Sequence, residues 1–254
     1  MARREKVKIH AITIDFWGTL LFDGPGTDNR YKRRRMADFE RLLGAAGIIV
    51  YADDLDEAYD ESASFLSRVW SQNRDVPAED HVTAILDALD PGLVDRVPAG
   101  VKAALLDAYA APALLVPPTV DDGALGALET LCARGYTLAV VSNTMRTPGA
   151  TLRKLLEGYG LAGCFTHVTF SDEVGVRKPD PAIFNLTLQA IGAEPRHTVH
   201  VGDDMTLDVD GGRAAGLRVI QVTDAPLRAL GVNGPDEVVP SLATLPDAIS
   251  RLER

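Results

Sequence analysis

Four segments of this chain place polar side chains directly after a short apolar run, where a buried strand would end. They are Asp15 to Leu20, Ser142-Asn143-Thr144, Lys178-Pro179, and Gly202-Asp203-Asp204 with Asp208 just beyond it. The first reads Asp-Phe-Trp-Gly-Thr-Leu, the form of a reactive aspartate at a strand end followed by a turn at Gly18 and Thr19. Each segment alone is compatible with a helix cap or a solvated turn. The four together predict one shared site.

The chemistry that these residue types favour is attack by a carboxylate. A carboxylate such as Asp15 can attack phosphorus and form a covalent intermediate, which divides one difficult displacement into two easier steps. Two anions repel each other, by roughly 4 kcal/mol at 4 Å when the effective dielectric constant is about 20. The site therefore needs positive charge. Lys178 is one candidate source, because its compact ammonium can bridge the nucleophile and a phosphate.

A divalent ion is the second candidate source of positive charge. Asp203, Asp204 and Asp208 would be unfavourable beside Asp15 unless they held a hard cation. Mg²⁺ prefers oxygen ligands and is usually bound through one or two carboxylates together with waters and a substrate phosphate. The sequence therefore predicts magnesium as the cofactor.

The elements that must position these residues are read from hydrophobic periodicity. Apolar runs without strict alternation predict buried parallel strands at 9–15, 138–142, 168–171, 198–202 and 219–222. Apolar residues at three-to-four spacing predict helices at 124–132, 152–159 and 183–191, and the C-terminus suits a last edge strand at 237–239 and a closing helix at 242–252. We expect an α/β fold, a doubly wound parallel sheet whose strands carry the site at their carboxyl ends.

One long stretch breaks this alternation. Between about 24 and 118 the sequence shows helical periodicity and no convincing strand. Turn signals bracket the stretch, Gly24-Pro25-Gly26 at its start and Pro112 with Pro117-Pro118 at its end. We therefore expect a core of residues 1–23 and 115–254, with an all-helical unit of residues 24–114 inserted after the first strand.

In this order, and each at a strand end, the four segments resemble the sequence motifs of the haloacid dehalogenase superfamily, whose members are mostly phosphatases that work through an aspartyl-phosphate. The resemblance implies a Rossmann-like core and a mobile helical cap of the C1 type in the inserted unit. It implies that Asp15 is the nucleophile, and that Asp15, Asp203 and the backbone carbonyl of Trp17 bind Mg²⁺.

The same resemblance assigns supporting roles to the other motif residues. Asp204 adds charge, and Asp208 orients Lys178 or a metal-bound water. Ser142 and the amide after it hold phosphate oxygens. The residues expected to contact the substrate or its phosphate are Phe16, Trp17, Ser142, Asn143 and Lys178, with Gly18 and Thr19 shaping the turn after the nucleophile.

Trp17 departs from the pattern of the resembling phosphatases, which carry an aspartate there that protonates the leaving oxygen and then activates water. An indole cannot shuttle a proton, and loss of a positioned acid or base typically costs about 10²- to 10⁴-fold in rate. Asp23 or a residue of the inserted unit is the alternative source of the proton. The dehalogenase branch of the superfamily carries an aromatic residue at this place, because a halide leaves without a proton. That branch uses no metal, however, and has Ser and Asn in its fourth motif.

Three functions follow, in this order. The first is a magnesium-dependent phosphatase acting on a small phosphate monoester. The second is a 2-haloacid dehalogenase, and the third is a weakly active or inactive relative that binds a phosphorylated ligand.

Net charge, cysteine count and the lengths of the apolar runs limit the expected classes of partner and the expected location. A net charge of −10 argues against duplex nucleic acid, and the one basic cluster, 32–35, is expected to be a solvated helix start. Two cysteines suit a reducing compartment. Because no apolar run has the length of a secretory signal or a membrane span, the cytoplasm is the expected location. The expected partner is a small phosphorylated molecule, and the sequence indicates no oligomeric state.

Overall fold

The fold is described here by a computed structural model, which places residues 8–223 and 234–253. Six strands form one parallel sheet in the order β5-β4-β1-β6-β7-β8. Their bounds are β1 Ala11–Ile14, β4 Thr137–Ser142, β5 His167–Phe170, β6 Thr198–Gly202, β7 Arg218–Val222 and β8 Glu237–Val239. The first strand lies in the middle, paired with β4 on one side and β6 on the other. The predicted α/β fold is confirmed, and β8 is an edge strand as expected.

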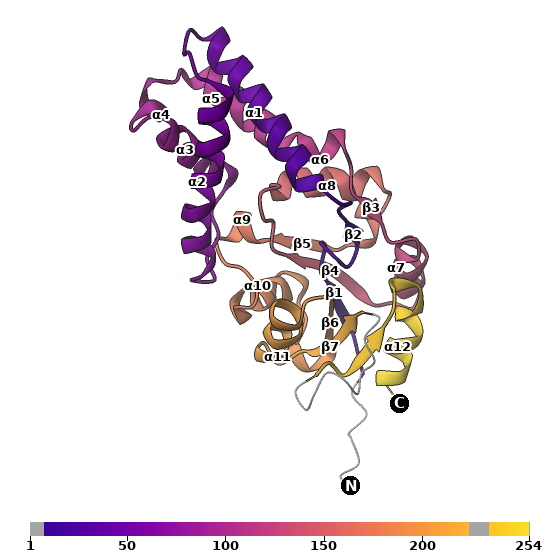
Figure 1. Cartoon of the computed structure of the whole chain (residues 1–254). Coiled ribbons are helices and arrows are strands. Elements are labelled where there is room, and N and C mark those ends of the chain that lie inside the picture. Colours follow the sequence, from indigo (N-terminus) through magenta and orange to yellow (C-terminus); the bar gives the residue numbers. More distant parts are fainter. Residues whose placement is uncertain (1–7, 224–233, 254) are drawn as a thin grey trace.

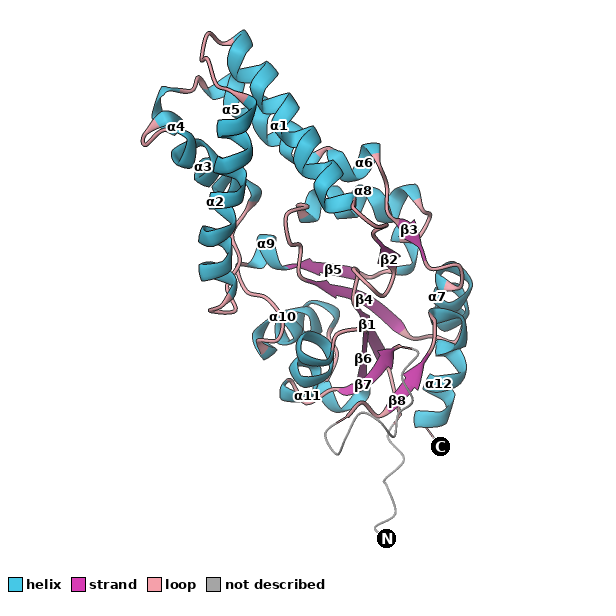
Figure 2. Ribbon diagram, viewed as in Figure 1, coloured by secondary structure: helices cyan, strands magenta, loops and turns pink. Residues whose placement is uncertain are grey.

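Helices cover both faces of this sheet (Figure 1, Figure 2). They are α7 Ala124–Ala133, α8 Gly149–Gly158, α9 Ser171–Val174, α10 Pro181–Ile191, α11 Gly211–Ala214 and α12 Leu245–Leu252. Ile12 and Ile14 belong to an apolar cluster shared with α7, α8 and α12. Val141 belongs to a second cluster, shared with α10 and the end of α11. A strand covered on both faces needs apolar residues throughout, which explains the continuous runs in the sequence.

A second group of helices lies beside the sheet, at the upper end of the molecule in Figure 1. It consists of α1 Thr27–Ala45, α2 Ala52–Trp70, α3 Ala78–Leu89, α4 Leu93–Arg96, α5 Ala99–Ala110 and α6 Pro112–Leu115. Residues of α1, α2, α3 and α5 form an apolar cluster of their own, which includes the fully buried Phe39, Leu55, Ile85 and Leu105. The helices expected between 24 and 118 are therefore present. The division into domains at 24 and 114 stays a prediction.

A short antiparallel pair of strands, which the sequence did not indicate, connects the two groups. Leu21–Phe22 (β2) pairs with Thr119–Val120 (β3). These strands have two residues each, too few for a periodic signal. They bring the chain that enters the second group of helices next to the chain that leaves it. Within the described residues, no helix has both the length and the apolar character needed to cross a membrane.

The expectation for the basic cluster at 32–35 is wrong for Arg35. Arg33 and Arg34 are exposed, but Arg35 is only 2% exposed. Its guanidinium donates to the carbonyl oxygens of Tyr109 at 2.8 Å and Arg146 at 2.7 Å, and to the hydroxyl of Tyr59 at 3.0 Å. A guanidinium can be buried when several acceptors satisfy its N–H groups. The basic character of the cluster did not indicate this burial, because the three acceptors belong to residues distant from Arg35 in the sequence.

His81 on α3 gives a prediction for the pH dependence of stability. It is 3% exposed and its Nδ1 lies 2.8 Å from the Tyr109 hydroxyl. Burial lowers the pKa of His81 to about 3, and the positive charges of Arg146 and Arg35 add to the shift. The folded protein therefore keeps this ring neutral where the unfolded chain, with a pKa near 6.5, takes up a proton. As the pH falls from 7 to 5, we expect this residue to lower the free energy of unfolding by about 2 kcal/mol.

Urea denaturation of the wild type and His81→Asn at pH 7 and pH 5 measures this effect. Asparagine does not titrate, so the variant should lose less of its free energy of unfolding between the two pH values. Equal losses in the two proteins would show that His81 is not the source of the acid sensitivity.

Candidate active site

Three of the four predicted segments meet because their strands are neighbours. Asp15 follows β1, Ser142 ends β4, and Asp203 follows β6, and β4 and β6 both pair with β1. The carboxyl ends of parallel strands lie along the same edge of a sheet, which is where ligands bind in such folds. The prediction of a strand end is wrong for the fourth segment, because Lys178 lies in the loop between α9 and α10. From this loop its side chain reaches Asp15 at the same edge of the sheet.

Lys178 is the centre of the site. Its Nζ lies 2.6 Å from Oδ1 of Asp15 and 2.5 Å from Oδ1 of Asp208, and its side chain is 1% exposed. Asp208 is fully buried and is held from further sides. Its Oδ1 lies 2.9 Å from Nε2 of His200, and its Oδ2 accepts a hydrogen bond from the backbone N–H of Asp204 at 3.0 Å. The lysine is thus fixed between the proposed nucleophile and a second carboxylate.

Burial favours the neutral form of the neighbouring imidazole. Burial lowers the pKa of His200. Because the Asp208 carboxylate only accepts hydrogen bonds, Nε2 of His200 is the donor to it, and Nδ1 accepts from the Thr13 hydroxyl at 2.9 Å. The sequence alone does not indicate a specific role for His200. In the structure it positions Asp208, and its place on β6, four residues before Asp204, was the available signal.

Burial has the opposite effect on the carboxylates, because it raises the pKa of an acid. It raises the pKa of Asp15 to about 7, against the effect of the Lys178 ammonium and with the charges of Asp208 and Asp203 adding to the rise. It also raises the pKa of Asp203. For Asp208 burial acts in the same direction, but the charge of Lys178 and the hydrogen bond from His200 hold its pKa well below the ordinary value. Asp15 and Asp203 are therefore the two acids that lack sufficient positive charge.

The donor set fits a divalent ion. Asp15, Asp203 and Asp208 each place a carboxylate oxygen within 4.8 Å of the others. When all three are ionised, three negative charges face the single positive charge of Lys178, which leaves a formal charge of −2. Oxygen ligands with this excess of negative charge are what Mg²⁺ requires.

Two glycines are required by this close approach of carboxylates. Gly18 has a φ of +76°, and a Cβ there would lie 2.5 Å from Oδ2 of Asp203. A Cβ at Gly202 would lie 2.2 Å from Cγ of Asp208. Thr19, which is fully buried, adds a hydrogen bond from its hydroxyl to Oδ1 of Asp203 at 3.4 Å. The turn after Asp15 is therefore shaped to receive Asp203.

The segment after β4 is also held in place. Ser142 is 1% exposed, and its hydroxyl donates to the backbone carbonyl of Asn143 at 3.3 Å. The side chain of Asn143 bonds to the backbone of Lys178 twice, donating to its carbonyl at 3.1 Å and accepting from its N–H at 2.9 Å. The asparagine side chain therefore positions the lysine, which the sequence did not indicate. Because both polar atoms of this side chain are engaged, Asn143 can contact a phosphate only through its backbone.

Two further predicted residues have surroundings that narrow their roles. Asp204 is exposed, lies outside the carboxylate cluster, and caps the helical turn Met205–Asp210 by accepting from the N–H groups of Thr206 and Leu207. It thus behaves as a helix cap. Phe16 is fully buried, with its ring 6.2 Å from that of Phe170. Only its backbone is available to a ligand.

Trp17 lines a cavity of about 620 Å³ that lies between the sheet and helices α1 and α2 of the inserted group. The indole packs edge-on against Phe16 with ring centroids 5.0 Å apart. Its Nε1 is buried, and no described residue accepts its hydrogen bond. The cavity is also lined by aromatic residues, Phe22, Tyr31, Tyr59 and Trp70, and by Asp23, the alternative proton source named above. Burial and the nearby charge of Asp28 raise the pKa of Asp23.

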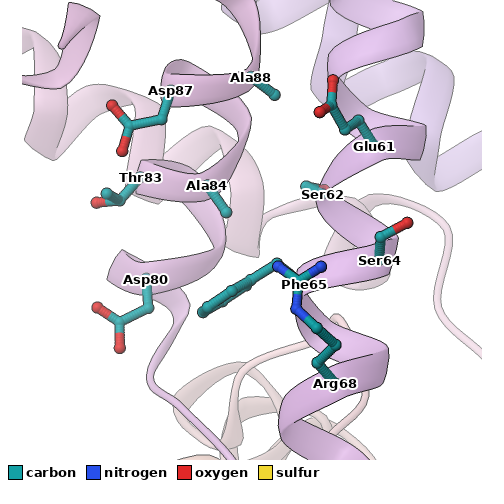
Figure 3. Close-up of a pocket in the computed structure, with 10 residues that line it drawn as sticks. All are labelled: Glu61, Ser62, Ser64, Phe65, Arg68, Asp80, Thr83, Ala84, Asp87 and Ala88. Carbon is teal, nitrogen blue, oxygen red and sulfur yellow. The ribbon is translucent and has the colours of Figure 1, made fainter. Parts of the chain in front are cut away.

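Another cavity, of about 410 Å³, lies between α2 and α3. Figure 3 shows the ring of Phe65 of α2 pointing toward α3, whose Ala84 and Ala88 face α2 across the cavity. None of the four predicted segments lines this cavity. The cavity beside Trp17 is therefore the candidate substrate site.

Comparisons with known proteins agree with this geometry. A family model described as haloacid dehalogenase-like hydrolase matches residues 9–216. The chain is 41% identical over 113 residues to a phosphoglycolate phosphatase of Rhodospirillum rubrum, covering 44% of this chain and 45% of that protein. It is 39% identical over 137 residues to a mouse haloacid dehalogenase-like hydrolase domain-containing protein 3, covering 53% of each. The chain thus spans about half the length of these curated relatives.

A solved structure extends the likeness to nearly the whole chain. The 2-haloacid dehalogenase of Pseudomonas syringae pv. Tomato DC3000 superposes with a TM-score of 0.59, over 96% of this chain and 99% of that one, at 23% identity. At this level of identity the match supports the shared fold alone.

Proposed function

The chain belongs to the haloacid dehalogenase-like hydrolases, and we propose that it is a magnesium-dependent phosphatase that hydrolyses a small phosphate monoester through an aspartyl-phosphate at Asp15. One observation carries the proposal. Lys178 bridges Asp15 and Asp208 at 2.6 and 2.5 Å while Asp203 completes a carboxylate cluster with an excess of negative charge. This arrangement suits a site that receives both a divalent cation and a phosphate.

In the proposed reaction Asp15 attacks phosphorus. A bond forms between its carboxylate oxygen and phosphorus while the bond from phosphorus to the leaving oxygen breaks, and water later hydrolyses the acyl phosphate. Lys178 reduces the repulsion between the nucleophile and the phosphate. Ser142 and the backbone N–H of Asn143 donate hydrogen bonds to phosphate oxygens, where negative charge is held during transfer.

Asp15, Asp203 and the backbone carbonyl of Trp17 would hold Mg²⁺, with Asp208 close by. The ion supplies positive charge for the nucleophile and the phosphate when it is bound. The role of Asp208 in this proposal is to hold Lys178 in line with Asp15, since its own carboxylate is already engaged by Lys178 and His200. Named phosphatases among the relatives, such as the phosphoglycolate phosphatase, support this choice of reaction.

A 2-haloacid dehalogenase is the second candidate, and Trp17 is the observation that favours it. A halide leaves without a proton, so an aromatic residue in place of the acid would not slow that step. The carboxylate cluster argues against this candidate. A haloacid brings its own carboxylate, and three acidic groups within 4.8 Å of one another would repel it unless a cation were present.

The experiment that tests the proposed function measures two products. Phosphate release from p-nitrophenyl phosphate should depend on Mg²⁺ and stop with a chelator. Chloride release from 2-chloropropionate, unaffected by chelator, would instead establish the dehalogenase. No turnover of either compound, with inorganic phosphate still bound, would leave the protein as a binding relative and end the proposal.

Substitution of Trp17 tests the missing acid. We expect Trp17→Asp to raise phosphate release from alkyl phosphates on the order of tenfold or more, because the carboxyl can protonate a poor leaving group. Aryl phosphates, whose leaving groups need little protonation, should change less. Trp17→Phe removes the indole N–H without adding an acid and is the control. A fall in rate for Trp17→Asp, with normal folding and Mg²⁺ binding, would show that the indole itself assists the reaction.

The proposed partner is a small phosphorylated molecule bound in the cavity beside Trp17, and the proposed location is the cytoplasm. The substrate within this class is set by the inserted helices, which supply Tyr31, Lys32 and Tyr59 to the cavity. We propose that these helices act as a cap over the site, which excludes water during the reaction.

A further inference from the structure

We propose that Asp75, in the loop between α2 and α3, is a positioning residue for the segment Ser142–Thr144. The loop belongs to the inserted helical unit, whereas the segment ends a strand of the sheet. This inference rests on the proposed function, since it assumes that Ser142 and the following amide hold a phosphate.

The carboxylate of Asp75 is buried and its oxygens are in use. Its side chain is 0% exposed. Oδ1 accepts hydrogen bonds from Nε1 of Trp70 at 2.9 Å and from the backbone N–H of Val76 at 3.0 Å. Oδ2 accepts from the hydroxyl of Ser171 at 2.5 Å and lies 3.6 Å from Nη1 of Arg177. A buried charge with this many partners holds one orientation.

Ser171 carries this constraint to the phosphate segment. Its hydroxyl is fully buried and has a single proton, which it donates to Asp75. The oxygen is left as an acceptor, and the backbone N–H of Thr144 donates to it at 2.9 Å. Asp75 of the inserted unit therefore orients the peptide group between Asn143 and Thr144 through one intervening residue, Ser171.

The same loop also holds the chain that leads to Lys178. The backbone carbonyl of Asn73 accepts from the N–H of Arg177 at 3.1 Å, and the N–H of Asp75 donates to the carbonyl of Gly175 at 3.3 Å. Arg74 and Val176 form an antiparallel bridge between these two pairs. The Arg177 guanidinium lies 4.5 Å from the centre of the Trp70 ring. One loop of the inserted unit is thus attached to the segments that precede Lys178 and follow Ser142.

These contacts predict which of the two ligands Asp75 affects. Asp75 should matter for the phosphate, which Ser142 and the adjacent amide hold, and not for Mg²⁺, whose proposed ligands lie on the ends of β1 and β6. A residue that only stabilises the fold would not separate the two ligands in this way.

The test uses the chain of 254 residues and two variants, Asp75→Asn and Ser171→Ala, with titration calorimetry. The probes are Mg²⁺ alone and inorganic phosphate in the presence of saturating Mg²⁺. We expect each variant to bind phosphate about tenfold more weakly, as for one lost or misplaced buried hydrogen bond, and to bind Mg²⁺ within twofold of the wild type. The value of kcat/KM for p-nitrophenyl phosphate should fall by a similar factor. Asp87→Asn, an exposed aspartate of the same helical unit, is the matched control and should change neither affinity.

The outcomes separate this inference from the proposed function. Phosphate affinity within twofold of the wild type in folded variants, or Mg²⁺ affinity that falls as much as phosphate affinity, would overturn the role of Asp75. If Asp75→Asn does not fold, Ser171→Ala alone decides the question, because it leaves the carboxylate with its other partners. A wild type that binds phosphate but releases none from esters would end the proposed function. The phosphate affinities of the variants would still decide the positioning role of Asp75. A wild type that binds no phosphate would end both.

Discussion

Asp15→Asn is expected to abolish phosphate release while the protein stays folded. An amide has no anionic oxygen with which to attack phosphorus, and it is a poorer ligand for a hard cation than a carboxylate. We expect the loss in kcat to be on the order of 10⁴-fold or more, as for other removals of a nucleophile. The fold should tolerate the change. Burial already raises the pKa of Asp15 to about 7, so the folded protein accepts an uncharged group at this position.

Steady-state kinetics with p-nitrophenyl phosphate and thermal unfolding of the same preparations measure both halves of this expectation. Asp87→Asn serves as the control, because it makes the same chemical change on an exposed surface of the helical unit. Full activity in the folded Asp15→Asn variant would remove Asp15 as the nucleophile.

Lys178→Met is expected to reduce both activity and stability. Methionine is uncharged and of similar length, so the change removes the ammonium and leaves the space filled. Two buried carboxylates, those of Asp15 and Asp208, are then left without the cation that lies 2.6 and 2.5 Å from them. Removal of one partner from a buried ion pair typically costs about 3 to 5 kcal/mol of stability. We expect a loss of this size at pH 7 in the absence of Mg²⁺, and a fall in kcat on the order of 10³-fold or more.

The sign of the pH effect follows from the charges. Without Lys178, the pKa of Asp15 in the folded variant rises further above its value in the unfolded chain. The folded variant therefore binds more protons than the unfolded chain, and its free energy of unfolding increases as the pH falls through that range. Urea denaturation at pH 7 and pH 5 should show the gap between variant and wild type narrowing at pH 5. A gap that is absent at pH 7, or that widens at pH 5, would mean that Lys178 does not neutralise these carboxylates.

The sheet and the main site residues were predictable from sequence because their signals are local. Each strand of the sheet coincides with a short run rich in β-branched and aliphatic residues, and strands 198–202 and 237–239 have the predicted bounds. The meeting of Asp15 with Asp203 then follows from a general rule, that ligands bind at the carboxyl ends of parallel strands. The short pair of strands β2 and β3 carries too few residues for such a signal.

What the sequence did not indicate depends on tertiary contacts. Arg35 lies in a run of four basic residues, and only the folded chain brings it to the carbonyls of Tyr109 and Arg146. Asp75 lies 96 residues before Ser171 in the sequence, in a segment without a motif. The bonds from the Asn143 side chain to the backbone of Lys178 likewise join two motifs that no local pattern connects.

The most direct test of the proposed reaction is a crystal structure of the wild type with Mg²⁺ and beryllofluoride, a mimic of the phosphoryl group. We expect the beryllium to be bonded to a carboxylate oxygen of Asp15, Mg²⁺ to lie between Asp15 and Asp203, and Lys178 and Ser142 to contact fluorides. An ion bound elsewhere, or beryllofluoride away from Asp15 when Mg²⁺ is present, would contradict it.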